Sequence, residues 1–219
     1  MLSPCHANDS AWAPAFAGAT GLSVTVHVPP PMRVFLDFEA SSLRKNGFPV
    51  EVGWVFEDGA SEGHLIRPAP GWSDWDVAAE AIHGLSRERL EREGVPHDAV
   101  ARRMVETLGP HDLYASAPSW DGKWLSLLLR SGGFPRHTLR LRDTDVAQQE
   151  SAESLFASRL PKAEVARIVA EIMAAVRADA EKTRPRHRAV DDAEEERRRW
   201  LEVCRLAAER AAALGLAPA

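Results

Sequence analysis

Residues 33–42 read RVFLDFEASS, a strand-like segment that runs into two acids, Asp37 and Glu39, on either side of Phe38. Residues two apart in a β-strand point to the same face, so the two carboxylates would emerge together. Burying two neighbouring like charges costs free energy unless a cation or a proton compensates them. The segment therefore allows two interpretations. Either the strand ends at Leu36 and both acids lie in a solvated loop, or the pair is half of a metal site.

The overall composition is that of one medium-sized globular domain of 219 residues. The formal net charge of −5 argues against tight, non-specific binding of nucleic acid through bulk charge. It leaves room for a local basic groove or for an acidic site that metal ions neutralise. Cys5 and Cys204 lie at opposite ends of the chain, so we expect no disulfide framework, no structural zinc and a cytoplasmic location. No apolar run approaches the length of a membrane span, and we expect no membrane partner.

The first 31 residues differ from the rest, being rich in small residues and ending in three prolines, Pro29 to Pro31. They lack the basic start and apolar stretch of a secretory signal. We expect a poorly ordered extension that is not necessarily native, with Met32 as the natural start and a domain over residues 32–219. The alternative is that residues 23–28, SVTVHV, add an edge strand.

The order of apolar segments and turn signals predicts an α/β fold. Strands are expected at 33–38, 49–59, 63–68, 112–119 and 138–145, and helices at 77–93 (as short turns), 97–109, 120–133, 151–160, 161–182 and 187–216. The short connections among the first three strands indicate an antiparallel meander, and the later strand–helix alternation indicates parallel strands. The expected architecture is a mixed five-stranded sheet flanked by helices on both faces.

Two further acids lie near predicted helix starts. Asp121 follows a strand and opens a helix, where capping is the ordinary role of an aspartate. In the last helix Asp191 lies about 180° around the axis from Trp200, whereas Asp192 lies only about 80° from it. Asp192 therefore borders the apolar stripe and needs a partner, for which a divalent ion is suitable. Oxygen ligands favour Mg²⁺ or Mn²⁺, and carboxylates around two such ions are suited to displacement at phosphate.

His187 precedes these aspartates and is the nearby side chain that titrates near neutral pH. It is our candidate general base, and the alternative is a surface histidine in the basic segment Arg184–Arg188.

The segments DFEAS, AIHGLS, SWDGKWL and HRAVDDA, in this order, resemble the motifs of the DEDDh branch of the proofreading-type 3′–5′ exonucleases, which includes RNase T and oligoribonuclease. The resemblance spans about residues 33–200 and implies a ribonuclease H-like fold. It also implies two metal ions, Mg²⁺ or Mn²⁺. In this resemblance Asp37 matches the acid that bridges both metals, and Glu39 matches the acid that binds a metal and orients the water. The remaining matches are Asp121 and Asp192 as metal ligands, His187 as the base, and Phe38, Ala40, Ser41 and His83 as substrate-binding positions, His83 at the terminal nucleotide.

The chain departs from the family pattern at three points, which put the substrate preference in doubt rather than the metal set. Ala117 stands four residues before Asp121, where the family often has Asn, and Ala40 stands where Thr is common. An extra helix is expected between Asp145 and His187. Its apolar stripe (Val165, Ile168, Ile172 and Val176) is interpreted as core, with a homodimer face as the alternative.

Aromatic and basic residues offer weaker indications. Trp72 and Trp75 are interpreted as a loop packed on the core, with base stacking as the alternative. We assign Trp54, Trp120, Trp124 and Trp200 to the core. Six arginines (Arg136, Arg140, Arg142, Arg184, Arg186 and Arg188) are candidates for a phosphate track, and the run Glu194–Arg199 is interpreted as solvated.

The sequence thus predicts a metal-dependent 3′–5′ exonuclease acting on single-stranded or frayed DNA or RNA ends and releasing nucleoside 5′-monophosphates. The first alternative is a non-catalytic nucleic-acid-binding or regulatory module that retains the fold. The second is an endonuclease of the same fold.

Overall fold

A computed structural model describes residues 30–180 and 186–216, and its helices and strands all belong to one unit, Pro31–Ala219. The strands are β1 (Arg33–Ala40), β2 (Pro49–Phe56), β3 (Ser61–Arg67), β4 (Val95–Pro96), β5 (Asp112–Ala115) and β6 (Leu141–Asp143). The helices are α1 (Val77–His83), α2 (Arg87–Glu93), α3 (His97–Leu108), α4 (Pro118–Ser131), α5 (Thr144–Ser154), α6 (Lys162–Ala180) and α7 (Ala189–Ala213). The predicted extension and the alternative edge strand at 23–28 lie outside the described residues.

The sheet confirms the predicted mixed topology, with one additional short strand. Within the described residues its order is β4-β3-β2-β1-β5-β6. β1, β2 and β3 form the antiparallel meander, and β5 and β6 continue from β1 in parallel. The sequence does not predict β4, because it is two residues long and pairs in parallel with the end of β3.

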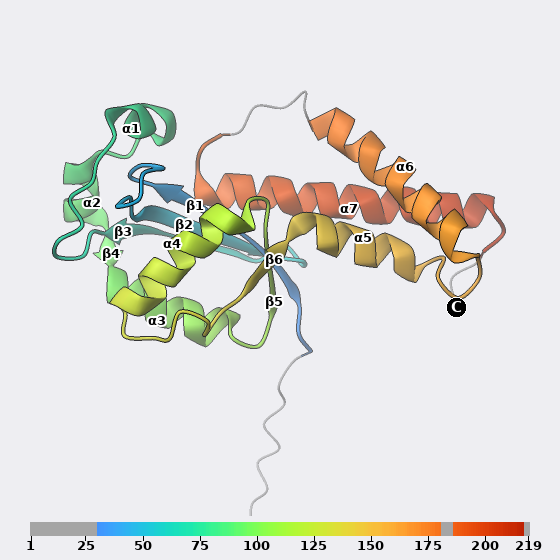
Figure 1. Ribbon diagram of the computed structural model, residues 1–219, viewed down its shortest axis with the longest axis horizontal. Coiled ribbons are helices and arrows are strands. Elements are labelled where there is room, and N and C mark those ends of the chain that lie inside the picture. The colour runs from blue at the N-terminus through green and yellow to red at the C-terminus, as the bar shows by residue number, and fades with distance from the viewer. Residues whose placement is uncertain (1–29, 181–185, 217–219) are drawn as a thin grey trace, which may run out of the picture. The chain divides into compact units, whose positions relative to one another are not determined.

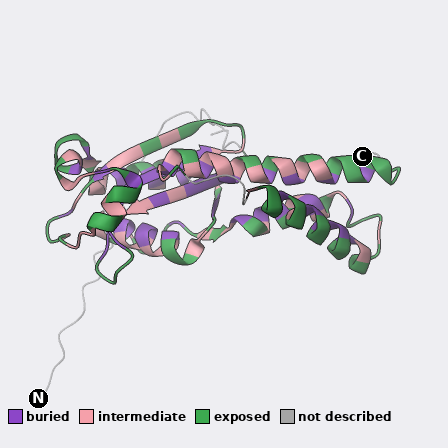
Figure 2. Ribbon diagram, turned by 90° about the horizontal axis from the view of Figure 1, so that it is seen from above, coloured by how far each residue is buried: buried purple, intermediate pink, exposed green. Residues whose placement is uncertain are grey.

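Alternation along β1 divides the core between the two faces of the sheet. Val34, Leu36 and Phe38 belong to the largest buried cluster, which β1 and β2 share with α3 and α4. Phe35 points the other way and packs with Trp200 of α7 and with residues of β5 and α5. The helices accordingly cover both faces of the sheet, and the central strands are the most buried part of the unit (Figures 1 and 2). Asp37 and Glu39 follow the period of Phe35, so they face α7.

The extra helix α6 packs against α5 and α7 (Figure 1). Its predicted apolar stripe is buried there, so the interpretation as core is confirmed. α5 begins at Thr144, seven residues before the predicted start. The reason is that the Asp143 side chain caps it by accepting a hydrogen bond from the Asp145 backbone N–H at 2.9 Å. None of the helices in the described residues combines the length and apolarity that crossing a membrane requires.

Candidate metal centre

The two acids of the first motif lie inside a strand and not in a loop. β1 continues to Ala40, so the alternative in which the strand ends at Leu36 is wrong. In the antiparallel register Asp37 is opposite Gly53 and Glu39 is opposite Glu51. Both acids are partly buried on the face that α7 covers, because α7 packs across β1 and β2.

The start of α7 brings His187 and Asp192 to the same place. One potential ligand atom from each of Glu39, His187 and Asp192 lies within 4.8 Å of the other two. The backbone N–H of Arg186 donates to Asp192 Oδ1 at 3.1 Å, which closes the turn around His187. Asp191 is exposed and pairs with the Arg186 guanidinium at 3.8 Å. The helix-face argument for Asp192 therefore agrees with where the structure puts the two residues.

Asp121 lies in the first turn of α4 and is only 4% exposed. Its pKa is raised to about 6, chiefly by burial, while the backbone N–H groups of Ala117, Phe38 and Asp121 itself favour the charged form. The capping interpretation is wrong, because the N-cap of α4 is Ala117 and no side chain caps this helix. Phe38 belongs to β1, so the charge of Asp121 is also favoured by an amide of the strand between Asp37 and Glu39.

These acids strongly perturb one another. Burial holds the pKa of Asp37 well above its usual range, and the charges of Asp121, Glu39, Asp192 and Glu196 add to the effect. Burial also raises the pKa of Glu39 to about 7, with further increases from Asp192 and Glu51 and a decrease from Arg188. In the described part of the chain no arginine, lysine or histidine forms an ion pair with Asp37. Clustered carboxylates that resist ionisation by themselves fit one or more divalent cations.

Glu196 is an acid of this region that sequence reasoning missed. The interpretation of the run Glu194–Arg199 as solvated is wrong at this position, since Glu196 is 9% exposed and burial raises its pKa. Its carboxylate accepts a hydrogen bond from Arg199 at 2.7 Å, and its charge reaches both Asp37 and Asp121. The signal was available, because Asp192, Glu196 and Trp200 recur at intervals of four along one face of the helix.

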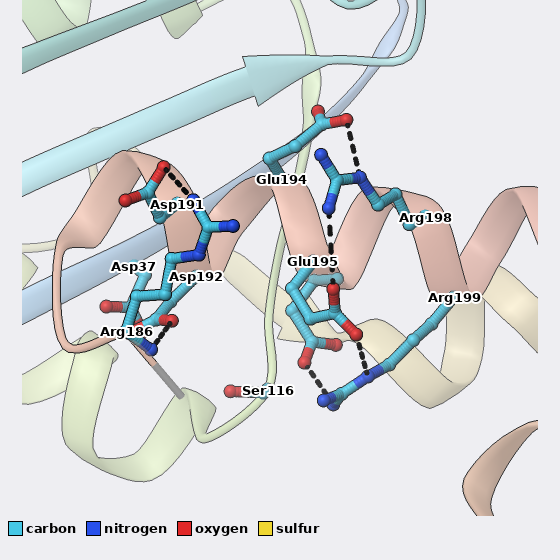
Figure 3. A pocket seen from close by; sticks show the side chains of 10 residues that line it. Asp37, Ser116, Arg186, Asp191, Asp192, Glu194, Glu195, Arg198 and Arg199 are labelled. Carbon is cyan, nitrogen blue, oxygen red and sulfur yellow. Dashed lines mark hydrogen bonds and ion pairs between the residues drawn. The ribbon is translucent and has the colours of Figure 1, made fainter. Parts of the chain in front are cut away.

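A cavity of about 520 Å³ opens beside Asp37 and Asp192 (Figure 3). In Figure 3 the arginines on its wall, Arg186 just before α7 and Arg198 and Arg199 within it, point at acids of α7. The cavity is lined by Asp37, Ser116, Arg186, Asp191, Asp192, Glu194, Glu195, Glu196, Arg198 and Arg199.

At least three of the six arginines predicted to line a phosphate track form ion pairs with acids of the chain. Arg142 pairs with Glu150, Arg186 with Asp191 and Arg188 with Glu51, so these guanidinium groups are committed to acids of the chain. Arg184 lies outside the described residues.

The predicted substrate-binding residues lie around β1 and α1. His83 is 5% exposed at the end of α1, its Nδ1 accepts a hydrogen bond from the Leu85 N–H at 3.1 Å, and burial lowers its pKa. Ser41 Oγ accepts a hydrogen bond from the Phe48 N–H at 3.0 Å, so this hydroxyl oxygen stabilises the loop between β1 and β2. Ala40 is half-buried at the irregularity that ends the β1–β2 register. The Phe38 side chain belongs to the core, which leaves its backbone as the part near the acids.

The tryptophans divide differently from the prediction. Trp72 stacks on Phe48 with ring centroids 5.3 Å apart, and Trp75 packs on the same ring, so the packed-loop interpretation is confirmed. The assignment of Trp120 to the core is wrong. It is 42% exposed because it lies on the outer side of the first turn of α4, stacked on Trp124. Lys123 Nζ lies 5.2 Å from the Trp120 ring centroid, so a cation and a partly exposed indole adjoin Asp121.

Comparisons with known proteins give structural matches only. No protein-family model matches the sequence, and a search of curated proteins gave no match. The structural neighbours include solved structures of E. coli exonuclease I.

The overlap with these structures is partial. A product-bound structure of exonuclease I gives a TM-score of 0.47 at 16% identity and covers 61% of this chain and 34% of that one. The metal-free E. coli enzyme in complex with single-stranded DNA gives 0.46 at 16% identity, with 56% and 30% covered. The chain thus spans about a third of the exonuclease I chains. A likeness at this level concerns the arrangement of strands and helices and says nothing of this chain's activity.

Proposed function

We propose that this chain is a metal-dependent 3′–5′ exonuclease that hydrolyses the terminal phosphodiester of single-stranded or frayed nucleic acid and releases nucleoside 5′-monophosphates. The observation that carries the proposal is the convergence of acids from three separate elements, β1, α4 and α7, on one place beside His187. Buried carboxylates repel one another and cost stability, so a site that gathers them needs a compensating cation.

The donor set fits divalent ions that prefer oxygen. Asp37, Glu39, Asp121 and Asp192 would hold Mg²⁺ or Mn²⁺, since no thiolate of the described chain lies among them. Bound ions of this kind neutralise charge on a phosphate and lower the pKa of a water molecule.

His187 is the group of this site suited to move a proton. A ring nitrogen of His187 lies within 4.8 Å of carboxylate oxygens of both Glu39 and Asp192. The imidazole would accept the proton of the attacking water at that nitrogen, and the negative charges beside it would stabilise the imidazolium that forms. Its backbone φ of 54° makes it the only described non-glycine residue in the left-handed region. Such strain is concentrated at functional sites and costs about 1–3 kcal/mol.

The exposed apolar side chains near the site suit the end of an unpaired strand. Trp120 precedes Asp121 directly and is 42% exposed, and Leu43 and Ile82 are also exposed, on the loop after β1 and on α1. A base stacked on an aromatic ring contributes about 1–3 kcal/mol whatever its sequence. A single strand is thus favoured over a duplex, whose bases are already stacked.

The test is degradation of oligonucleotides labelled at the 3′ or the 5′ end, DNA and RNA in parallel, with Mn²⁺ or with EDTA. Stepwise shortening from the 3′ end is expected, with monophosphate products. His187→Ala should lower the rate about 10²–10⁴-fold, the usual contribution of a general base. Matched to it, His137→Ala removes an exposed histidine of the α4–β6 loop and should leave the rate unchanged.

Three outcomes would redirect the proposal. Metal binding without degradation of any substrate would favour the non-catalytic binding module. Cutting of circular single strands would favour an endonuclease. Full activity in His187→Ala would remove His187 from the mechanism.

A further inference from the structure

The segment that carries His187 is anchored to β2 by a buried carboxylate. The Glu51 side chain is 6% exposed and accepts two hydrogen bonds from the Arg188 guanidinium. Arg188 Nη2 donates to Oε1 at 2.6 Å, and Arg188 Nε donates to Oε2 at 3.1 Å. Glu51 Oε2 also accepts the backbone N–H of Ala189 at 3.2 Å. One acid thus holds both the side chain and the main chain at the start of α7, in a two-pronged geometry that only arginine offers.

Two glycines let this helix start lie directly on the sheet. A Cβ at Gly53 of β2 would come within 2.3 Å of the Val190 backbone nitrogen. A Cβ at Gly63 of β3 would come within 2.4 Å of Val190 Cγ2. The backbone of α7 therefore sits in a socket that we define as Glu51, Gly53 and Gly63.

The socket lies beside the β1 acids in the strand register. Glu51 is opposite Glu39, and Gly53 is opposite Asp37. Any movement of the α7 start in this socket moves His187 and Asp192 relative to Glu39. His187 sits between two fixed points, the bond from the Arg186 N–H to Asp192 and the pairing of Arg188 with Glu51. Its left-handed backbone conformation persists only if such neighbours impose it.

We propose that Glu51 is a positioning residue, which through Arg188 and the Ala189 N–H holds His187 and Asp192 in register with Glu39. The inference rests on the proposed function, because it concerns how that same site is assembled. Glu51 does not itself belong to the group of ligand atoms formed by Glu39, His187 and Asp192.

The placement of a charge here is hard to explain by fold stability alone. A buried glutamate beside Glu39 adds a repulsive charge next to a carboxylate that already resists ionisation. Well-packed apolar residues often replace a buried ion pair without loss of stability. An apolar pair could not form directional hydrogen bonds to the Arg188 side chain and the Ala189 backbone amide at the same time.

The experiment compares Glu51→Gln and Arg188→Lys with a control pair away from the site. Glu62 on β3 also receives an arginine fork, from Arg103 at 2.8 Å and 2.8 Å, so Glu62→Gln removes the same kind of interaction. Three quantities are measured on each full-length variant. They are the Mn²⁺ dissociation constant by calorimetry, amide hydrogen exchange of residues 186–193, and kcat and KM on single-stranded DNA.

In Glu51→Gln we expect Mn²⁺ affinity to fall at least tenfold, exchange of residues 186–193 to rise at least tenfold, and kcat to fall at least tenfold with KM within threefold. Arg188→Lys keeps the charge but not the fork and should show the same changes to a smaller extent. Glu62→Gln should match the wild type in all three.

The proposal is overturned if Glu51→Gln leaves exchange in residues 186–193 and Mn²⁺ affinity within twofold of the wild type, whatever happens to its melting temperature. A wild type that binds no Mn²⁺ and cleaves nothing would instead refute the proposed function. Hydrogen exchange, which needs neither metal nor substrate, would then decide by itself whether Glu51 fixes the segment.

Discussion

Replacing Glu39 with glutamine should stabilise the metal-free protein at alkaline pH. The folded-state pKa of Glu39 is raised from 4.5 to about 7, so between these values the folded state binds more protons than the unfolded state. Stability of the metal-free wild type must therefore fall as pH rises through this window, and it stays reduced above it. Glutamine has nearly the same shape and no charge, so Glu39→Gln removes the fall.

The size of the effect follows from the shift. An increase from 4.5 to about 7 corresponds to about 3 kcal/mol at about 1.4 kcal/mol per unit. Glu39 is partly exposed, so solvent screening reduces this to about 1–2 kcal/mol. For a chain of this length that is about 2–8 °C in melting temperature. At pH 5 the two proteins should differ by much less.

Mn²⁺ should reverse the order of stability. An ion at a hundredfold excess over its dissociation constant stabilises the folded state by about 2.7 kcal/mol. The wild type should be stabilised by this amount, whereas Glu39→Gln, which lacks one ligand, should be stabilised far less.

The assay is thermal unfolding followed by circular dichroism at pH 5, 6, 7 and 8, in EDTA and in Mn²⁺. Glu106→Gln, on the exposed side of α3, is the matched control and should track the wild type throughout. The reasoning is refuted if Glu39→Gln is no more stable than the wild type in EDTA at pH 8. It is equally refuted if Mn²⁺ raises both melting temperatures alike.

Three further predictions concern neighbouring positions. Asp192→Asn should abolish the Mn²⁺-dependent rise in melting temperature, while Asp191→Asn should retain it; equal loss in both would contradict the placement of Asp192 at the metal. Trp120→Ala should weaken the binding of single-stranded DNA, measured by fluorescence anisotropy, by about 1–3 kcal/mol with little change in stability. Trp72→Ala should chiefly lower stability. Unchanged DNA binding by Trp120→Ala would exclude base stacking on that ring. Gly53→Ala should cost about 1–3 kcal/mol in urea unfolding, because its Cβ meets the backbone of α7, and a neutral substitution would show that this helix start can shift freely.

Local periodicity in the sequence was enough to predict several features of the site. The two-residue repeat of β1 puts Asp37 and Glu39 on one face, and the helical repeat distinguishes Asp192 from Asp191. Both depend only on backbone geometry over a few residues, and the structure agrees with both. The mixed sheet was predictable for the same reason, since strand length and connection length are local properties.

Local patterns also misled where exposure depends on what packs above a residue. Trp120 is a large apolar residue of the kind expected in a core, yet it is exposed. Glu196 belongs to a run of charged residues of the kind expected in solvent, yet it is buried. Glu196 is buried because α7 lies across β1, close to the charges of Asp37 and Asp121.

The sequence by itself therefore determined which residues share a face within each element. Only the tertiary structure decided which elements meet. Glu51 and Arg188 are 137 residues apart, and neither carries a local signal of the other. Their pairing arises because glycines on β2 and β3 let the start of α7 lie on the sheet, and such a fit depends on shapes formed only when the whole chain has folded.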